Sequence, residues 1–309
     1  VFISLILFEL FLYIDDYHPD YKQFSLLIGE NKYLVNDSPA DFFKDESPKK
    51  TVFLGDSFTV NKVCAHEKKD FVNLIKKKYS TESKSFYNFA IGGTGIAEYA
   101  AILSKISDHA QNIIIVLYYN DIFFDKNSCE SISELNNVGF RNVPFCKKII
   151  QTNIDSSNDT KLKAVDNFLE TRFYSYQLIK EALVNFPFIS DIYSRTKWGD
   201  LYLDYNSVEN ELFIDLLKFI KKTSREKNIS TNFIYFPDVV YLSEDNTRLQ
   251  TWKDFISYAD EQGIKINDPW EFFLENSSRT NLSWSYTDDH PNCEANQIMS
   301  IYLSNLFTF

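Results

Sequence analysis

The chain has 309 residues, enough for one large α/β domain or two small ones. Its 44% hydrophobic and 24% charged residues exclude a disordered protein, and its net charge of −11 argues against nucleic-acid binding, which needs a basic face. Aromatic residues make up 17% of the sequence. A carbohydrate-binding surface could use them, although a compositional bias towards Phe and Tyr is the simpler explanation.

The first predicted element is an apolar segment from Val1 to Ile14, which turns polar at Asp15 and Asp16. It is too short to span a bilayer, because a transmembrane helix needs about 20 residues. We expect residues 1–20 to be a truncated membrane anchor or signal-anchor remnant, which would place the globular part outside the cytoplasm, in a periplasm or at a cell surface. The alternative is an amphipathic helix that packs on the domain, in a protein that could also be cytoplasmic.

Five short apolar runs rich in Ile, Val, Phe and Tyr predict β-strands: Val52–Leu54, Phe86–Ile91, Asn112–Tyr119, Asn232–Phe236 and Ile264–Asn267. At least three of them lack polar alternation, which is typical of strands buried on both faces of a parallel sheet. Helical patterns lie between them, at about Val60–Lys78, Gly95–His109, Ser207–Lys227, Arg248–Gln262 and Glu294–Leu306. This alternation predicts a doubly wound α/β domain over residues 50–309, with ligands bound at the carboxyl ends of the strands.

Residues 122–205 interrupt the alternation. They contain the polar run Gln151–Thr160 and a predicted helix from Leu162 to Asn185. We interpret this stretch as an insert of loops and helices beside the active edge, where long inserts often shape a substrate pocket.

The four cysteines, Cys64, Cys129, Cys146 and Cys293, show no C-x-x-C spacing, and the four histidines are scattered. We therefore expect no metal site and no cofactor. Cys129 and Cys146 lie close together within the polar insert, and they could form a disulfide in an oxidising compartment.

The segment Thr51–Thr59 carries the most informative motif, because its apolar run ends abruptly in Gly55, Asp56 and Ser57 just before a helical pattern. A strand-to-helix turn offers free backbone N–H groups and the positive end of a helix dipole. Serine needs such surroundings, since it is a poor nucleophile unless it is activated and its oxyanion is stabilised. We expect Asp56 to tighten this turn through hydrogen bonds to nearby N–H groups.

Three further segments fall at strand ends or before the last helix. A glycine-rich turn holds Gly92 and Gly93, where the backbone can point an N–H group at a ligand. Asn120 ends the most hydrophobic strand and is a neutral donor able to reach an oxyanion, while its neighbour Asp121 is expected to bond the loop that carries Ser57. His290 is the histidine that stands next to acids at an element boundary.

With these motifs in this order, the chain resembles the SGNH (GDSL-type) hydrolase superfamily of esterases, lipases and carbohydrate O-acyl esterases, some of whose members transfer acyl groups to polysaccharides. The resemblance covers Thr51 to Leu306 and leaves the insert out. It implies a three-layer, flavodoxin-like α/β/α fold with a five-stranded parallel sheet. It also implies that Ser57 is the nucleophile, that His290 is the base, and that Ser57, Gly93 and Asn120 form the oxyanion hole.

The orienting acid departs from the commonest family pattern, which places an aspartate three residues before the histidine, where this chain has Thr287. Asp288 lies two residues before His290 in an Asp-x-His arrangement that resembles acetyltransferase-like members, and we take Asp288 as the acid. The alternatives are Asp289 and a Ser–His dyad assisted by a backbone carbonyl. Asp268, at the end of the fifth predicted strand, is a less favoured substitute.

The resemblance implies an enzyme that hydrolyses acyl esters, with acetyl favoured, on a carbohydrate or lipid of the cell envelope. An O-acyltransferase that modifies an extracellular glycan would use the same Ser57, His290 and Asp288, with a sugar hydroxyl in place of water. The non-enzymatic alternative is an inactive binding domain on the same scaffold. The expected partner is thus an acyl-ester small molecule or a glycan, with possible membrane attachment through the N-terminal segment.

Overall fold

The computed structural model describes the core of the chain, at residues 24–28, 31–61, 64–65, 68–118, 121, 126–135, 139–140, 208–239, 242, 247–278, 281–284 and 290–307. The predicted anchor (1–20), the predicted helix 162–185 and most of the insert lie outside these ranges. Within them, no helix combines the length and the apolar character that crossing a membrane requires.

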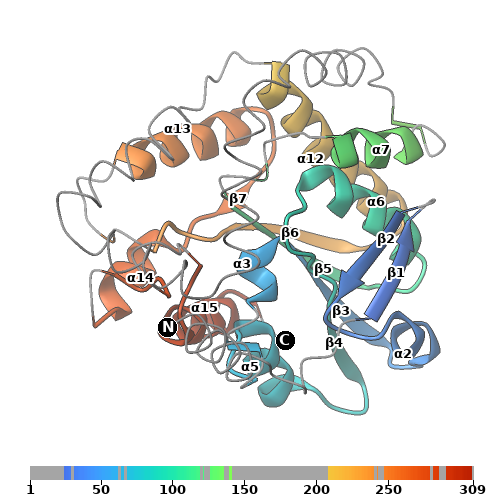
Figure 1. The fold of residues 1–309 in the computed structure, drawn as a ribbon, viewed down its shortest axis with the longest axis horizontal. Helices are drawn as coiled ribbons and strands as arrows, with labels where there is room; N and C mark the ends of the chain where they lie inside the picture. The colour runs from blue at the N-terminus through green and yellow to red at the C-terminus, as the bar shows by residue number, and fades with distance from the viewer. Residues whose placement is uncertain are drawn as a thin grey trace, which may run out of the picture.

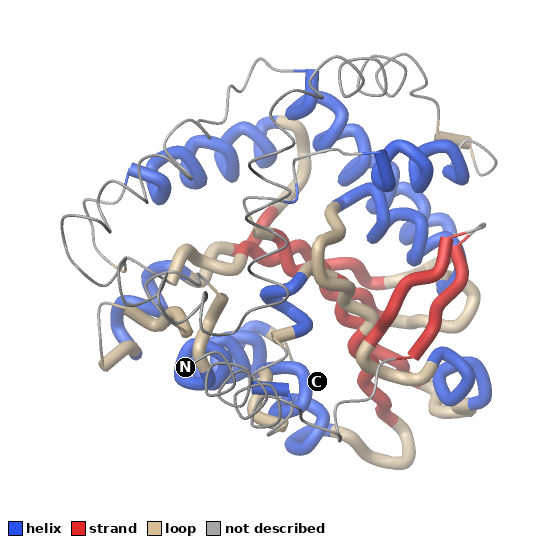
Figure 2. The backbone as a smooth tube through the Cα atoms, viewed as in Figure 1, coloured by secondary structure: helices blue, strands red, loops and turns tan. Residues whose placement is uncertain are grey.

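A five-stranded parallel sheet forms the middle layer, with the strand order β4-β3-β5-β6-β7 (Figures 1 and 2). Its strands are β3 (Lys49–Leu54), β4 (Lys84–Asn88), β5 (Asn112–Leu117), β6 (Ser230–Tyr235) and β7 (Ile266–Asn267). Every residue of β3 and β5 after the first is buried, as expected where helices cover both faces of a sheet. The predicted parallel sheet is confirmed, and its strands differ from the predicted runs only at their ends.

Helices cover both faces of the sheet (Figure 1). One face carries α5 (Phe71–Tyr79), α14 (Trp270–Asn276) and α15 (Cys293–Leu306), and the other carries α6 (Ile96–Ile106), α12 (Val208–Glu226) and α13 (Thr247–Glu261). On the second face, α7 (Lys126–Leu135) packs on α6, and the rings of Phe213 in α12 and Phe255 in α13 lie 5.4 Å apart. The three-layer α/β/α prediction is therefore confirmed.

The predicted helix Val60–Lys78 is not continuous. A short helix, α3 (Ser57–Val60), ends at Asn61, whose φ of 35° is in the left-handed region that Asn tolerates better than most residues. The Asn61 side chain accepts a hydrogen bond from the Cys64 N–H, and α5 begins only after Asp70, whose carboxylate caps it by accepting from the Asn73 N–H at 3.0 Å. The prediction of one continuous helix over Val60–Lys78 was wrong, because hydrogen bonds from local side chains to the backbone compete with continuation of the helix.

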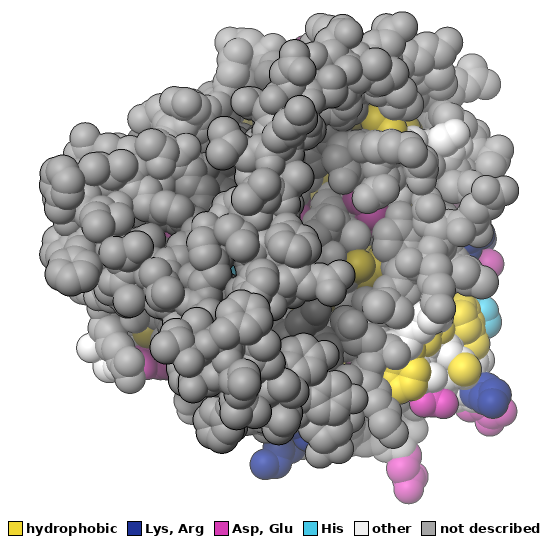
Figure 3. Space-filling view, in the orientation of Figure 1, with side chains coloured by type: hydrophobic (Ala, Val, Ile, Leu, Met, Phe, Trp, Pro, Cys, Tyr) yellow, Lys and Arg dark blue, Asp and Glu magenta, His cyan; other side chains and the backbone are white. Residues whose placement is uncertain are grey.

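An antiparallel hairpin of β1 (Phe24–Ile28) and β2 (Asn31–Val35), and the helix α2 (Pro39–Lys44), precede the main sheet and were not predicted. Helix α2 begins with a typical cap: the Ser38 side chain accepts a hydrogen bond from the Asp41 N–H, and Pro39 is the first helical residue. On the face drawn in Figure 3, hydrophobic side chains reach the surface around α2, where Phe43 is 42% exposed.

Candidate active site

Ser57 stands at the turn between β3 and α3, as its strand-to-helix pattern predicted. Asp56 caps α3 and accepts a hydrogen bond from the Phe58 N–H at 2.9 Å, which makes Ser57 the first residue of the helix. A Cβ atom on Gly55 would lie 2.1 Å from the Thr59 Oγ1 and 3.0 Å from the Val116 carbonyl oxygen, so that a larger residue would push the turn away from β5. The Ser57 side chain itself stays half-buried.

The glycine-rich turn after β4 lies directly against Ser57. The chain leaving β4 continues alongside β3, because the Ile91 N–H donates to the Gly55 carbonyl at 2.9 Å. This contact brings Gly92 so close that a Cβ on it would lie 3.7 Å from the Ser57 Cβ. Gly93 follows with a φ of 75°, a conformation that favours glycine. The sequence predicted a role for Gly93 and none for Gly92, although both residues lie in the same turn.

Two of the three predicted oxyanion donors thus lie on adjoining loops. Within the described part of the chain, neither the Ser57 N–H nor the Gly93 N–H donates to an acceptor. Backbone N–H groups that are left over at a helix start and at a tight turn can bind an oxygen atom of a ligand that carries developing negative charge.

His290 reaches the same place from the far end of the sequence. Its ring stacks on the ring of Phe58, the residue after Ser57, with the centroids 4.9 Å apart and the planes at 25°. Phe58 in turn stacks on Tyr118 at the end of β5, with centroids 3.5 Å apart. The His290 backbone is held as well, because its carbonyl accepts from the Trp284 N–H at 2.7 Å.

The loop of His290 is fastened to the segment after Ser57 by a hydrogen bond and a disulfide. The Asn61 side chain donates to the Pro291 carbonyl at 2.6 Å, across 230 residues of sequence. A disulfide joins Cys64 to Cys293, with their Cα atoms 5.5 Å apart. Because these links leave from residues just after Ser57 and His290, they hold the loop of His290 against the segment that follows Ser57.

The Cys64–Cys293 disulfide is a pairing that the sequence did not indicate, since 229 residues separate the two cysteines. Cys129 is disulfide-bonded too, but its partner is not among the described residues. The pairing of Cys129 with Cys146 therefore stays a prediction.

Asp121 is a buried carboxyl group beneath the site. Its Oδ2 accepts from the Tyr118 N–H and its Oδ1 accepts from the Tyr99 hydroxyl, both at 2.7 Å. These bonds tie the end of β5 to α6, whereas the sequence suggested a bond to the loop of Ser57. Burial, followed by the negative charge of Asp56, raises the pKa of Asp121 well above its ordinary value.

The raised pKa of Asp121 has a testable consequence for stability. An unfolded chain ionises this carboxyl near its ordinary pKa, while the folded chain keeps it protonated, so the folded state loses stability as pH rises between the two pKa values. We expect Asp121→Asn to remove this loss, which amounts to roughly 1.4 kcal/mol for each pH unit in that window. Urea unfolding at several pH values measures it, and parallel pH profiles of wild type and variant would contradict it.

The remaining predicted site residues, Asn120, Asp288 and Asp289, lie outside the described residues, so the side-chain oxyanion donor and the orienting acid stay predictions. Asp268, the less favoured acid, is engaged at the start of α14, where its Oδ1 accepts from the Trp270 N–H at 2.9 Å. Burial raises the pKa of Asp268. In the part of the chain that the structure describes, no group of three or more His, Cys, Asp or Glu side chains is arranged to hold a metal ion.

No family model matches this sequence, and no curated protein matches it either. Among solved structures, an acetyl xylan esterase superposes over 83% of this chain and 98% of its own, with a TM-score of 0.44 and 13% identity. A lipase from a goat rumen metagenome covers 83% of this chain and 96% of its own, with a TM-score of 0.44 and 16% identity. An esterase from a Pseudoalteromonas species covers 83% and 95%, with a TM-score of 0.42 and 13% identity. At this identity and TM-score, these superpositions do not indicate an activity for the chain.

Proposed function

We propose that this protein is a serine esterase of the SGNH type, with Ser57 as nucleophile, His290 as base and Asp288 as orienting acid. One observation carries the proposal. Residues from three distant parts of the sequence meet at one sheet edge, where Gly92 lies against Ser57 and the His290 ring stacks on Phe58. A capping serine, a turn glycine or a loop histidine explains each residue alone, but not their meeting at the carboxyl end of β3.

The proposed reaction is acyl transfer through an acyl-enzyme. His290, in its neutral form, accepts the proton of the Ser57 hydroxyl as Oγ attacks the ester carbonyl, and the carbonyl π electrons move to oxygen. The N–H groups of Ser57 and Gly93, with the Asn120 amide, stabilise that oxyanion. When the intermediate collapses, the alkoxy group leaves with the proton from His290, and water then attacks the acyl-enzyme by the same steps in reverse.

The proposed substrate is an acyl ester, with acetyl favoured, on a carbohydrate or lipid outside the cytoplasm. The Cys64–Cys293 disulfide supports this location, because disulfides persist mainly in oxidising compartments. It supports the location independently of the N-terminal segment, on which the sequence-based expectation of an extracytoplasmic, membrane-anchored protein rested.

An O-acyltransferase that modifies an extracellular glycan is the second candidate. It is favoured by the Asp-x-His spacing of Asp288 and His290, which resembles that of acetyltransferase-like members of the superfamily. The two candidates share the acyl-enzyme and differ only in whether water or a sugar hydroxyl attacks it.

The experiment that tests the proposal follows the fate of the acyl group. The purified protein is first treated with a fluorophosphonate probe, which should label Ser57; absence of labelling on the folded protein would favour an inactive binding domain. It is then incubated with p-nitrophenyl acetate, with and without a glycan acceptor. Free acetate with unmodified glycan, identified by mass spectrometry, indicates the esterase, whereas an acetylated glycan indicates the transferase.

A further inference from the structure

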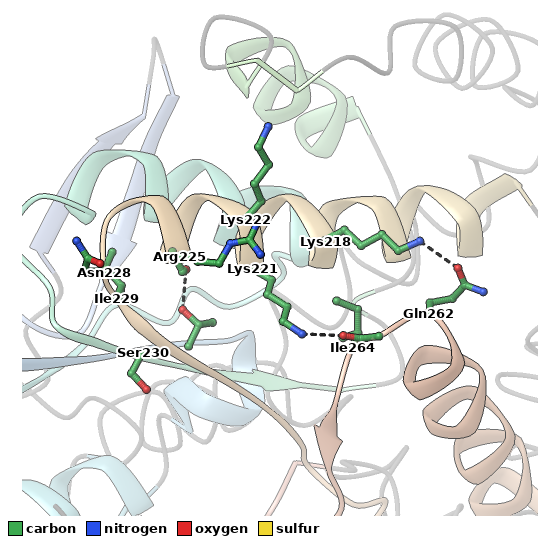
Figure 4. Close-up of a pocket in the computed structure, with 12 residues that line it drawn as sticks. Lys218, Lys221, Lys222, Arg225, Asn228, Ile229, Ser230, Gln262 and Ile264 are labelled. Carbon is green, nitrogen blue, oxygen red and sulfur yellow. Dashed lines mark hydrogen bonds between the residues drawn. The ribbon is translucent and has the colours of Figure 1, made fainter.

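A basic pocket lies at the edge of the sheet opposite to Ser57. It is formed by the C-terminal half of α12, the start of β6 and the turn that joins α13 to β7, and its volume is about 670 Å³ (Figure 4). The pocket meets β6 at Ser230 and Thr231, the amino end of that strand, whereas Ser57 follows the carboxyl end of β3. Because β3 and β6 are parallel members of one sheet, the basic pocket is separate from the candidate active site.

Four cations line the basic pocket from a single helix face. Lys218 and Lys222, like Lys221 and Arg225, are four residues apart along α12, so the four cations lie on one side of the helix over a length of about 10 Å. No Asp or Glu is among the described residues that line the pocket. Such a cluster is unexpected in a chain whose net charge is −11.

Among the described residues, two of these cations contact neutral groups only. Figure 4 shows Lys218 and Lys221 reaching from α12 to the turn after α13. The Lys218 Nζ donates to the Gln262 side-chain oxygen at 3.0 Å, and the Lys221 Nζ donates to the Gly263 carbonyl at 2.7 Å. An amide oxygen accepts a hydrogen bond but brings no negative charge, so no described residue forms an ion pair with either ammonium group, and each ammonium keeps further donors.

The other two cations are Lys222 and Arg225, which differ in their contacts. Lys222 lies 3.9 Å from Glu226, but both side chains are more than half exposed, and such a surface pair holds its members weakly. Arg225 forms no ion pair within the described part of the chain. Its planar guanidinium can bind one anionic group through two parallel hydrogen bonds.

We propose that the basic pocket binds a small ligand that carries two or more phosphate or carboxylate groups. Its volume falls within the range of small-molecule sites, roughly 300–1,000 Å³. Four cationic side chains from about 10 Å of one helix can meet several anionic groups of one compact molecule. A long polyanion such as a nucleic acid would meet the acidic remainder of the surface, whereas a compact ligand senses the local charges, since salt screens exposed charges beyond about 8–10 Å.

Arg225, in the last turn of α12, can instead have a structural role, because the negative end of the helix dipole attracts positive side chains. The two roles lead to different results. A purely structural role affects the melting temperature and leaves no saturable anion binding, whereas a binding site gives a defined stoichiometry that depends on the pocket cations.

Isothermal titration calorimetry of the full chain at low ionic strength tests the proposal with two probes, inorganic pyrophosphate and trigalacturonate. We expect one of them to bind at one site per chain, and which one binds identifies phosphate or carboxylate as the ligand chemistry. The variant Lys222→Gln/Arg225→Gln should weaken that binding at least about tenfold, since it removes two charge-assisted contacts. These side chains do not bond the turn after α13, so the fold of the pocket should persist.

The matched control is Lys77→Gln/Lys105→Gln, which also removes two positive charges, but at exposed positions on α5 and α6. It should keep the affinity within about twofold, since the local contacts are intact. Failure of both probes to bind saturably overturns the proposal, and so does an equal loss in pocket variant and control. A lower melting temperature of the pocket variant with unchanged ligand binding overturns the proposal as well. Ester hydrolysis is not part of the test, so its outcome is independent of the proposed function.

Discussion

Replacing Ser57 by Ala should reduce the turnover of p-nitrophenyl acetate by about 10³-fold to 10⁶-fold, the range found when a catalytic serine is removed. The variant should remain folded, because the Ser57 side chain is half-buried and makes no hydrogen bond to any described residue. Its free energy of unfolding should therefore stay within about 0.5 kcal/mol of wild type. Initial rates and urea unfolding on the same preparations measure the two quantities.

Ser83→Ala is the matched control, because Ser83 is an exposed serine in the turn before β4 and lies outside the candidate site. It should keep the wild-type rate. If Ser57→Ala also keeps that rate, Ser57 is not the nucleophile. If the rate and the free energy of unfolding of Ser57→Ala fall together, the serine has a structural role instead.

Removing the Cys64–Cys293 disulfide should lower both stability and kcat. The Cys64→Ser/Cys293→Ser variant should lose about 2–5 kcal/mol of unfolding free energy, since a cross-link over 229 residues restricts the unfolded chain. The kcat should fall by up to about a hundredfold with little change in KM, because a small displacement of His290 disturbs proton transfer more than substrate binding. Urea unfolding and steady-state kinetics, with and without a reductant, measure these effects.

The comparison for this prediction is Cys129→Ser/Cys146→Ser, which leaves the Cys64–Cys293 disulfide in place. Its kcat should fall less than that of the Cys64→Ser/Cys293→Ser variant. Asn61→Gly offers a second test that leaves the disulfide in place, since it removes the amide that donates to Pro291 while glycine retains the positive φ of Asn61. A normal kcat in both Asn61→Gly and the disulfide variant would show that these links do not position His290.

Much of the fold could be predicted from the sequence, because strands buried on both faces leave long apolar runs. The runs at Val52–Leu54 and Asn112–Tyr119 correspond to β3 and β5, and the pattern at Ser207–Lys227 corresponds to α12. Ser57 could also be predicted from the sequence, because its motif is local: it consists of a strand end, a glycine and a helix-capping residue. The break between α3 and α5 was not predicted, because the periodicity of apolar residues does not indicate that Asn61 adopts a positive φ.

Contacts between distant segments were decided by the tertiary structure alone. Three such contacts are the Cys64–Cys293 disulfide, the stacking of His290 on Phe58 and the approach of Gly92 to Ser57. In each case, the local sequence around one residue does not indicate which residue it contacts. The same holds for the basic pocket, where α12 supplies the cations and the turn after α13 supplies the facing wall. Hydrophobic periodicity specifies which elements form and which faces they bury, whereas the packing of those elements determines which side chains meet.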